Sequence, residues 1–138
     1  MKKILVADDN RGIREYCREV FEEDGYHVVL ACDGVEAVRA FRQETPDLVI
    51  LDLRMPRLNG LEALEQIKAI CPAVPTIIFT ANDEDCVQDQ RGLLATACIE
   101  KTEDLTELQR AVRRGLRAES PEGETILRTG LPTRPCPI

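Results

Sequence analysis

The sequence predicts a doubly wound α/β fold, in which five parallel strands form one sheet with helices on both faces. Two observations support this prediction. Short apolar runs alternate five times with amphipathic stretches, and the connections between them are short. The runs at 3–7, 47–51 and 76–79 are continuously apolar rather than alternating, which is typical of strands buried on both faces. Such alternation implies right-handed crossovers between parallel strands.

The five predicted strands are 3–7, 27–31, 47–51, 76–79 and 97–100. The first predicted helix lies between the first two strands, and its apolar residues recur at the spacing of one helical face. They are Ile13, Tyr16, Cys17, Val20 and Phe21. Gly25 is the residue type expected just past the end of this helix.

The second predicted helix, around 35–41, ends at Thr45, because a residue before proline disfavours the helical conformation. The third, around 61–68, ends at Cys71, which also precedes a proline. The fourth, around 84–93, has only a thin apolar stripe.

The fifth predicted helix carries an apolar face that runs from Leu105 to Leu116, and Thr102 is a candidate for its N-cap. From Glu119 onward the composition shifts to four prolines, two glycines and no aromatic residue. We therefore expect residues 1–118 to form a single domain. Residues 119–138 are expected to form a flexible Pro/Gly-rich tail or the start of a linker.

Composition narrows the class of protein. The 138 residues are 43% apolar, which is enough for one domain with its own core. A formal net charge of −7 argues against nonspecific binding to nucleic acid, which selects basic surfaces. The first apolar run stops at Ala7, and no segment approaches the length of a membrane span. We therefore expect a cytoplasmic protein without a membrane anchor.

Six cysteines are scattered along the chain without a C-x-x-C pair, and there is one histidine. This spacing does not match a metal–thiolate site, and a chain with its own core does not need a disulfide framework. Reduced thiols are therefore expected.

Polar residues follow the apolar runs of four predicted strands. They are, in chain order, Asp8 and Asp9, Asp52, Thr80 and Lys101. In open α/β sheets, sites form beyond the carboxyl ends of the strands, where the winding reverses. In the strand order 2-1-3-4-5, strands 1 and 3 are neighbours about 5 Å apart. Asp9 and Asp52 are therefore expected to lie almost in contact.

Three carboxylates this close raise one another's pKa values unless a cation is present. Mg²⁺ suits a site with few protein ligands, all of them oxygen, and it neutralises charge during phosphoryl transfer. Asp52 is then the natural nucleophile for an aspartyl-phosphate. Lys101 has the reach to pair with one phosphate oxygen, and Thr80 can donate a hydrogen bond to another. Each residue alone is more simply a cap, a turn or a surface charge, but their joint placement favours function.

The order of these residues, together with the run from Asp52 through Met55 and Pro56 to Asn59 and Gly60, resembles the receiver domain of bacterial two-component response regulators. The similarity covers about residues 1–118. It implies a flavodoxin-like fold, dependence on Mg²⁺, and phosphotransfer from a histidine kinase or a histidine phosphotransfer protein.

The resemblance also implies a role for each matching residue. Asp9 and Asp52 would bind Mg²⁺ directly, the backbone carbonyl of Arg54 would add a third ligand, and Asp8 would act through water. Asp52 would accept the phosphoryl group. Thr80 and Lys101 would sense it, and the response would appear on the face formed by the fourth helix, fifth strand and fifth helix.

The sequence departs from the family pattern on that output side. Thr102 replaces the proline that usually follows the lysine, so the preceding bond is expected to be trans. Cys98 replaces the aromatic residue that is common three positions before the lysine, and a thiol cannot report activation through the inward movement of a ring that is usual in the family. A packed core role is expected for Cys98. These features predict a domain that accepts phosphate and signals unconventionally.

Alternative functions are a degenerate receiver that acts as a phosphate-independent scaffold, or an aspartate-nucleophile phosphatase. The second is disfavoured because Arg54 stands where such a phosphatase needs a second acid. A flavin carrier is disfavoured because Asp8 and Asp9 would repel a phosphate. We expect a phosphoacceptor rather than a turnover enzyme, a monomer or weak homodimer, with its output in another chain and no direct contact with nucleic acid.

Overall fold

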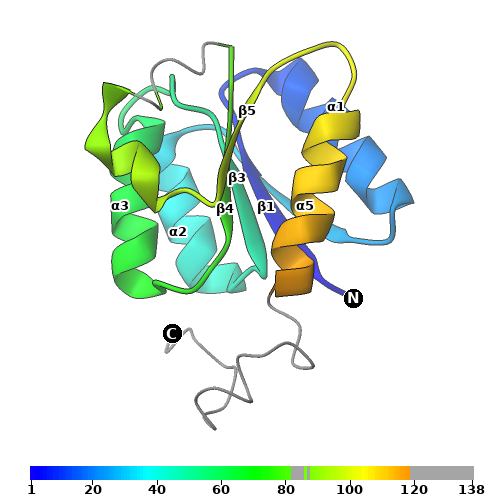
Figure 1. The fold of residues 1–138 in the computed structure, drawn as a ribbon, viewed down its shortest axis with the longest axis horizontal. Helices are drawn as coiled ribbons and strands as arrows, with labels where there is room; N and C mark the ends of the chain where they lie inside the picture. The colour runs from blue at the N-terminus through cyan, green and yellow to red at the C-terminus, as the bar shows by residue number, and fades with distance from the viewer. Residues whose placement is uncertain (82–85, 87, 119–138) are drawn as a thin grey trace, which may run out of the picture.

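A computed structural model describes residues 1–81, 86 and 88–118 of the chain. One parallel sheet runs through the centre of the molecule in the order β2-β1-β3-β4-β5, which confirms the predicted fold class (Figure 1). The strands are β1 (Lys3–Ala7), β2 (His27–Ala31), β3 (Leu48–Leu51), β4 (Thr76–Thr80) and β5 (Ala97–Glu100). Each lies within one residue of its predicted bounds.

Helices cover both faces of this sheet. They are α1 (Arg11–Glu23), α2 (Gly34–Glu44), α3 (Gly60–Ile70), the 3-10 helix η1 (Gln90–Leu94) and α5 (Thr106–Ala118). Helices α1 and α5 lie on one face, and α2, α3 and η1 lie on the other (Figure 1). The fold therefore has three layers, and its two faces pack separate cores.

The two cores follow from the alternation of side chains along each strand. Leu5, Val49 and Ile78 pack against α2 and α3. Their neighbours Ile50 and Ile77 pack against α1 and α5. Because both faces of the central strands are buried, these strands are apolar along most of their length, and their polar residues Lys3, Thr76 and Thr80 lie at strand ends.

The predicted helix ends at Gly25, Thr45 and Cys71 are confirmed, and the structure adds N-caps that were not predicted. The backbone N–H of Ile13 donates to the Asn10 side chain at the start of α1, and Gly25 follows α1 with a φ of 96°. Thr45 ends α2 in the left-handed conformation, with a φ of 43°. Asn59 and Glu62 form a reciprocal capping box at the start of α3.

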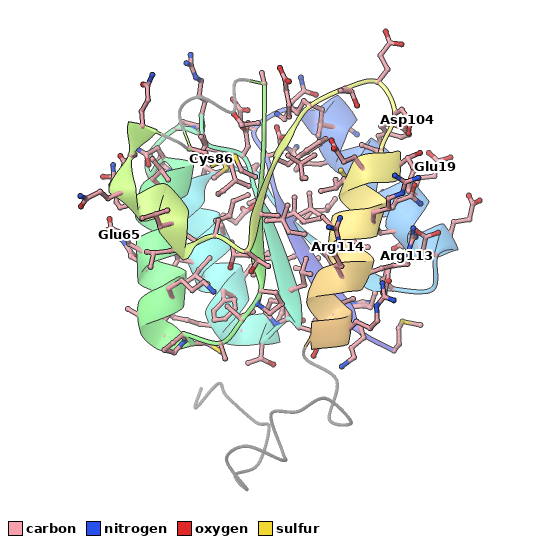
Figure 2. The ribbon with its side chains drawn as sticks, viewed as in Figure 1. Glu19, Glu65, Cys86, Asp104, Arg113 and Arg114 are labelled. Atoms are coloured by element: carbon pink, nitrogen blue, oxygen red, sulfur yellow. A yellow bond between two sulfur atoms is a disulfide. The ribbon has the colours of Figure 1, made fainter. Side chains whose placement is uncertain are left out.

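The predicted N-cap of α5 is wrong. Asp104, not Thr102, receives the backbone N–H of Thr106, at 2.6 Å, while the Thr102 hydroxyl donates to the carbonyl of Asp104. Figure 2 shows Asp104 at the N-terminal end of α5. A carboxylate there also interacts favourably with the helix dipole, because the N-terminal end of a helix is positive.

The prediction of a fourth helix over 84–93 falls partly on residues 82–85 and 87, which lie outside the described residues. Among the described residues of this stretch, Cys86 and Gln88 are α-helical, whereas Gln90–Leu94 form the 3-10 helix η1. Asp89 begins η1 by accepting the backbone N–H of Arg91 at 2.9 Å. Arg91 also pairs with Glu65 on α3 at 3.2 Å, so η1 is held against that helix.

Cys86 and Cys98 form a disulfide, and Cys71 is also disulfide-bonded, so the expectation of reduced thiols is wrong for these three cysteines. Cys17 is buried with a free thiol, and Cys32 is exposed with a free thiol. The predicted tail at 119–138 lies outside the described residues and stays a prediction. Among the described residues, every helix is too short or too polar to span a bilayer.

Candidate functional site

The predicted carboxylate cluster lies at the carboxyl ends of β1 and β3. These strands pair in register, with Ala7 opposite Leu51, so Asp8 and Asp52 each follow a paired residue. The backbone N–H of Asp52 donates to the Ala7 carbonyl at 2.9 Å, which holds the two strand ends together. One carboxylate oxygen from each of Asp8, Asp9 and Asp52 lies within 4.8 Å of the others. The structure thus brings together the three acids expected from the sequence.

The three carboxylates differ in their contact with solvent. Asp8 is 2% exposed and Asp52 is 5% exposed, whereas Asp9 is exposed. One oxygen of Asp8 accepts the backbone N–H of Asn10 at 2.9 Å. The cluster therefore has a buried floor and opens to solvent beside Asp9.

Lys101 extends its side chain into this cluster from the loop after β5. Its Nζ lies 2.8 Å from Asp8 Oδ2 and 3.2 Å from Asp52 Oδ2, so one ammonium bridges both buried carboxylates. The same Nζ lies 5.9 Å from the centre of the Phe79 ring on β4. The ring supports the lysine where it crosses β4 to reach Asp52.

Thr80 is the last residue of β4, the strand between those of Asp52 and Lys101, and it is 1% exposed. Its carbonyl accepts the backbone N–H of Lys101 at 2.7 Å. A shift of either backbone is therefore transmitted to the other. The structure places all five predicted side-chain positions at one edge of the sheet.

The loop after Asp52 is held in a tight path. The Arg54 backbone N–H lies 3.4 Å from Asp52 Oδ1, while the Arg54 residue is exposed. The Gly60 N–H donates to the Leu53 carbonyl at 2.9 Å and closes the loop. A Cβ on Gly60 would lie 2.1 Å from the Asp52 carbonyl oxygen, so only glycine fits there.

Sequence reasoning missed a contact that ties this loop to α2. Arg57, in the left-handed conformation with a φ of 69°, pairs with Asp33 at 2.9 Å. Asp33 also accepts the backbone N–H of Glu36 at the start of α2. This hydrogen bond lowers the pKa of Asp33, burial opposes it, and the contact with Arg57 lowers that pKa further. No spacing in the sequence signals an ion pair between residues this far apart.

The carboxylate cluster carries an excess of negative charge. Burial raises the pKa of Asp52, the charge of Asp8 raises it further, and Lys101 opposes both. Burial alone would lower the pKa of Lys101, but the contacts with Asp8 and Asp52 outweigh it and raise that pKa. Three carboxylates face one ammonium, so two negative charges remain uncompensated.

This donor set fits a hard divalent cation. All three side chains offer oxygen, which Mg²⁺ prefers, and two positive charges would balance the excess. The exposed Asp9 lies at the opening, where the ion could enter and keep water ligands.

The peptide bond between Lys101 and Thr102 is trans, as expected from the absence of proline.

Comparison with known proteins identifies the family to which a domain with this fold and carboxylate cluster belongs. The family model for the response regulator receiver domain matches residues 4–113. The chain is 38% identical over 120 residues to sporulation initiation phosphotransferase F of Bacillus subtilis, covering 86% of this chain and 97% of that protein. It is 40% identical over 122 residues to the response regulator MprA of a Mycobacterium species, covering 87% of this chain. The chain spans about half the length of MprA, 53%.

Solved structures agree with these relatives. The response regulator protein TrrA of Thermotoga maritima, solved in complex with Mg(2+)-BeF, superposes with a TM-score of 0.79 at 35% identity, covering 83% of this chain and 98% of TrrA. A CheY-like receiver domain protein of Methanospirillum hungatei superposes with a TM-score of 0.81 at 26% identity, covering 89% of this chain and 99% of that one. The chain therefore belongs to the response regulator receiver domain family.

Proposed function

We propose that this domain accepts a phosphoryl group on Asp52 in a Mg²⁺-dependent reaction and so switches its binding to a partner protein. The observation that supports this most directly is the bridge from Lys101 to both Asp8 and Asp52, with Asp9 beside them. Asp52 is the nucleophile because its carboxylate lies at the floor of the cluster with Oδ1 directed to the Arg54 backbone.

In this proposal Asp9 and Asp52 bind Mg²⁺ directly, Asp8 acts through water, and the Arg54 carbonyl completes the protein ligands. The bound ion would supply positive charge that screens the carboxylates from an incoming phosphate. Asp8 is fixed for its role by the Asn10 N–H, which leaves its other oxygen for Lys101.

Lys101 and Thr80 receive the phosphoryl oxygens. Lys101 already lies 3.2 Å from Asp52 Oδ2, so a short movement of its ammonium would pair it with a phosphate oxygen. Thr80 would donate its hydroxyl from the neighbouring strand. Because Lys101 donates its backbone N–H to the Thr80 carbonyl, the two loops would respond together.

The phosphodonor is proposed to be a phosphohistidine on a histidine kinase or a histidine phosphotransfer protein. The name phosphotransferase of the Bacillus subtilis relative supports a place in phosphotransfer, and we propose that the domain acts stoichiometrically, without turnover. We further propose a cytoplasmic location, a monomer or weak homodimer, and a downstream partner reached by protein contact. The −7 net charge argues against direct contact with nucleic acid.

The test is to incubate the protein with acetyl phosphate and Mg²⁺, with and without a chelator, and to measure intact mass. We expect one phosphoryl adduct that the chelator prevents and that Asp52→Asn abolishes. Asp47→Asn is the matched control, because Asp47 precedes the other end of β3, where it accepts the Lys3 N–H. An adduct retained in Asp52→Asn would place the acceptor elsewhere. No adduct in a folded, Mg²⁺-binding protein would favour the phosphate-independent scaffold.

A phosphatase mechanism receives no support from the site. The residue two positions after Asp52 is Arg54, which is exposed and cannot donate a proton to a leaving group near neutral pH. Release of phosphate from small esters under the same conditions would contradict this assignment.

A further inference from the structure

The disulfide between Cys86 and Cys98 lies within the segment that joins Thr80 to Lys101. Thr80 ends β4, Cys86 follows it, Cys98 lies on β5, and Lys101 follows β5. The two residues proposed to contact the phosphoryl group are therefore the two ends of a segment that the disulfide closes internally. None of the sulfur atoms belongs to the carboxylate cluster.

Packing holds both cysteines in place for this bond. Cys98 pairs in register with Ile78 on β4 and packs against the core on the α2–α3 face. Cys86 is 6% exposed and lies in the same core. Their Cα atoms are 6.8 Å apart, at the upper end of the range that a disulfide spans without backbone movement.

The 3-10 helix η1 connects the two cysteines and fixes the approach of Cys86. A Cβ on Gly92 would lie 2.1 Å from the Cys86 carbonyl oxygen, so the backbones of η1 and Cys86 are in direct contact. Arg91 holds η1 to Glu65 on α3. Figure 2 shows Cys86 on the same flank of the sheet as Glu65.

We propose that Cys86 and Cys98 form a reversible thiol–disulfide pair that restrains the segment carrying Thr80 and Lys101. The inference rests on the proposed phosphoacceptor function. In the disulfide form, Cys86 is tied to β5, so Cys86 and the strand that leads to Lys101 move as one body. In the dithiol form Thr80 and Lys101 can rearrange separately toward a phosphoryl group on Asp52.

The oxidation is a thiol–disulfide exchange with a low-molecular-weight disulfide such as oxidised glutathione. Cys98 is the first to react because it is only partly buried, whereas Cys86 is buried. Its thiolate attacks one sulfur of the small disulfide and releases one small thiolate. The Cys86 thiolate then attacks the Cys98 sulfur of the mixed disulfide and releases the second. The two protein thiols lose two protons and two electrons, and the small disulfide becomes two thiols.

The remaining free cysteines provide controls. Cys17 is buried on α1, on the opposite face of the sheet, and Cys32 is exposed after β2. Neither lies between Thr80 and Lys101. Replacing Cys32 by serine removes an exposed thiol without touching the proposed switch.

The first arm of the experiment identifies the bond. The protein is equilibrated with oxidised glutathione or with dithiothreitol, alkylated and digested with trypsin, which cleaves after Lys68, Arg91 and Lys101. Peptide 69–91 contains Cys86, and peptide 92–101 contains Cys98. We expect the two peptides to be linked only after oxidation, and the link to be lost in Cys86→Ser. A link that never forms, or one that persists in Cys86→Ser through Cys71 of the same peptide, would overturn the proposal.

The second arm measures the consequence by hydrogen exchange over residues 80–101, with and without Mg²⁺ and beryllofluoride as a phosphoryl mimic. We expect beryllofluoride to slow exchange in the dithiol form and to have a smaller effect in the disulfide form. This difference should be lost in Cys86→Ser and Cys98→Ser and kept in Cys32→Ser. If beryllofluoride slowed exchange measurably and equally in both redox states, the proposed effect of the disulfide on Thr80 and Lys101 would be overturned, but the phosphoacceptor function would not. No response even in the dithiol form would count against the phosphoacceptor function as well, while the peptide map would still report the bond.

Discussion

Gly60 lies so close to Asp52 that a Cβ on the glycine would be 2.1 Å from the Asp52 carbonyl oxygen. The first residue of α3 thereby packs directly on the backbone of the proposed nucleophile. The start of this helix is fixed by the capping box of Asn59 and Glu62, so the loop has little freedom to move away. The position of the Asp52 carboxylate therefore depends on a residue that carries no chemistry.

Gly60→Ala is expected to destabilise the domain and to displace Asp52. The new methyl group would meet backbone atoms that cannot rotate away, and overpacking of this kind costs about 1–3 kcal/mol. Urea unfolding would measure the loss. Gly12→Ala on α1 is the control, because its Cβ would meet only the side-chain oxygen of Asn10 at 3.2 Å. Equal effects of the two changes would contradict the argument.

Lys101→Ala should weaken the fold but strengthen binding of Mg²⁺. Removing the ammonium leaves Asp8 and Asp52 without their bridge, which we expect to cost roughly 2 kcal/mol of unfolding free energy in the absence of metal. The same change removes a positive charge that repels the ion. Calorimetric titration with Mg²⁺ and urea unfolding would measure both effects. Lys3→Ala, which breaks an ion pair with Glu44 at the amino end of the sheet, should leave Mg²⁺ affinity unchanged.

Asp52→Asn is expected to raise stability at pH 7 in the absence of metal. The pKa of Asp52 is raised in the folded state, first by burial and then by Asp8, so its ionised form costs stability above that pKa. The cost disappears as the pH falls through the raised pKa toward the ordinary value of 3.8. The advantage of the neutral amide should shrink over the same range. Urea unfolding at several pH values would check this, and an advantage that grows on acidification would refute it.

Cys17 should resist alkylation in the folded protein, whereas Cys32 should react. Burial, followed by the charge of Asp8, raises the pKa of Cys17 to about 12. Near pH 8 only about one Cys17 thiol in ten thousand would then be the reactive thiolate. A pulse of iodoacetamide labels the accessible thiols, and a second alkylating reagent added after unfolding labels the rest. After tryptic digestion, the ratio of the two labels on peptide 15–18, which contains Cys17, can be compared with the ratio on peptide 19–39, which contains Cys32. Comparable labelling of the two thiols would mean that α1 opens readily.

The sheet and the carboxylate cluster could be predicted because each depends on a local pattern. Continuous apolar runs define β1, β3 and β4, and a parallel sheet brings their carboxyl ends to one edge. Asp8, Asp9 and Asp52 then lie together whatever the details of the loops. Neighbouring strand spacing is sufficient to make that prediction.

The features that were missed depend on contacts between residues far apart in sequence. Cys86 and Cys98 meet where the 3-10 helix η1 brings Gly92 against the Cys86 backbone. A thin apolar stripe gave no indication of that geometry. The cap of α5 was assigned to Thr102 because threonine is a common cap, whereas the chain turns once more and presents Asp104.

The direction of the strands has a practical consequence for handling this protein. Every strand points its carboxyl end toward the carboxylate cluster, so β1 starts and α5 ends at the opposite edge of the sheet (Figure 1). A surface anchor or fluorescent label attached at the amino end of β1 or on the last turn of α5 would lie at the edge of the sheet opposite Asp52. When the domain is immobilised through either of these two points, its carboxylate cluster faces the solution. Binding of a donor protein could then be followed without the support blocking access to Asp52.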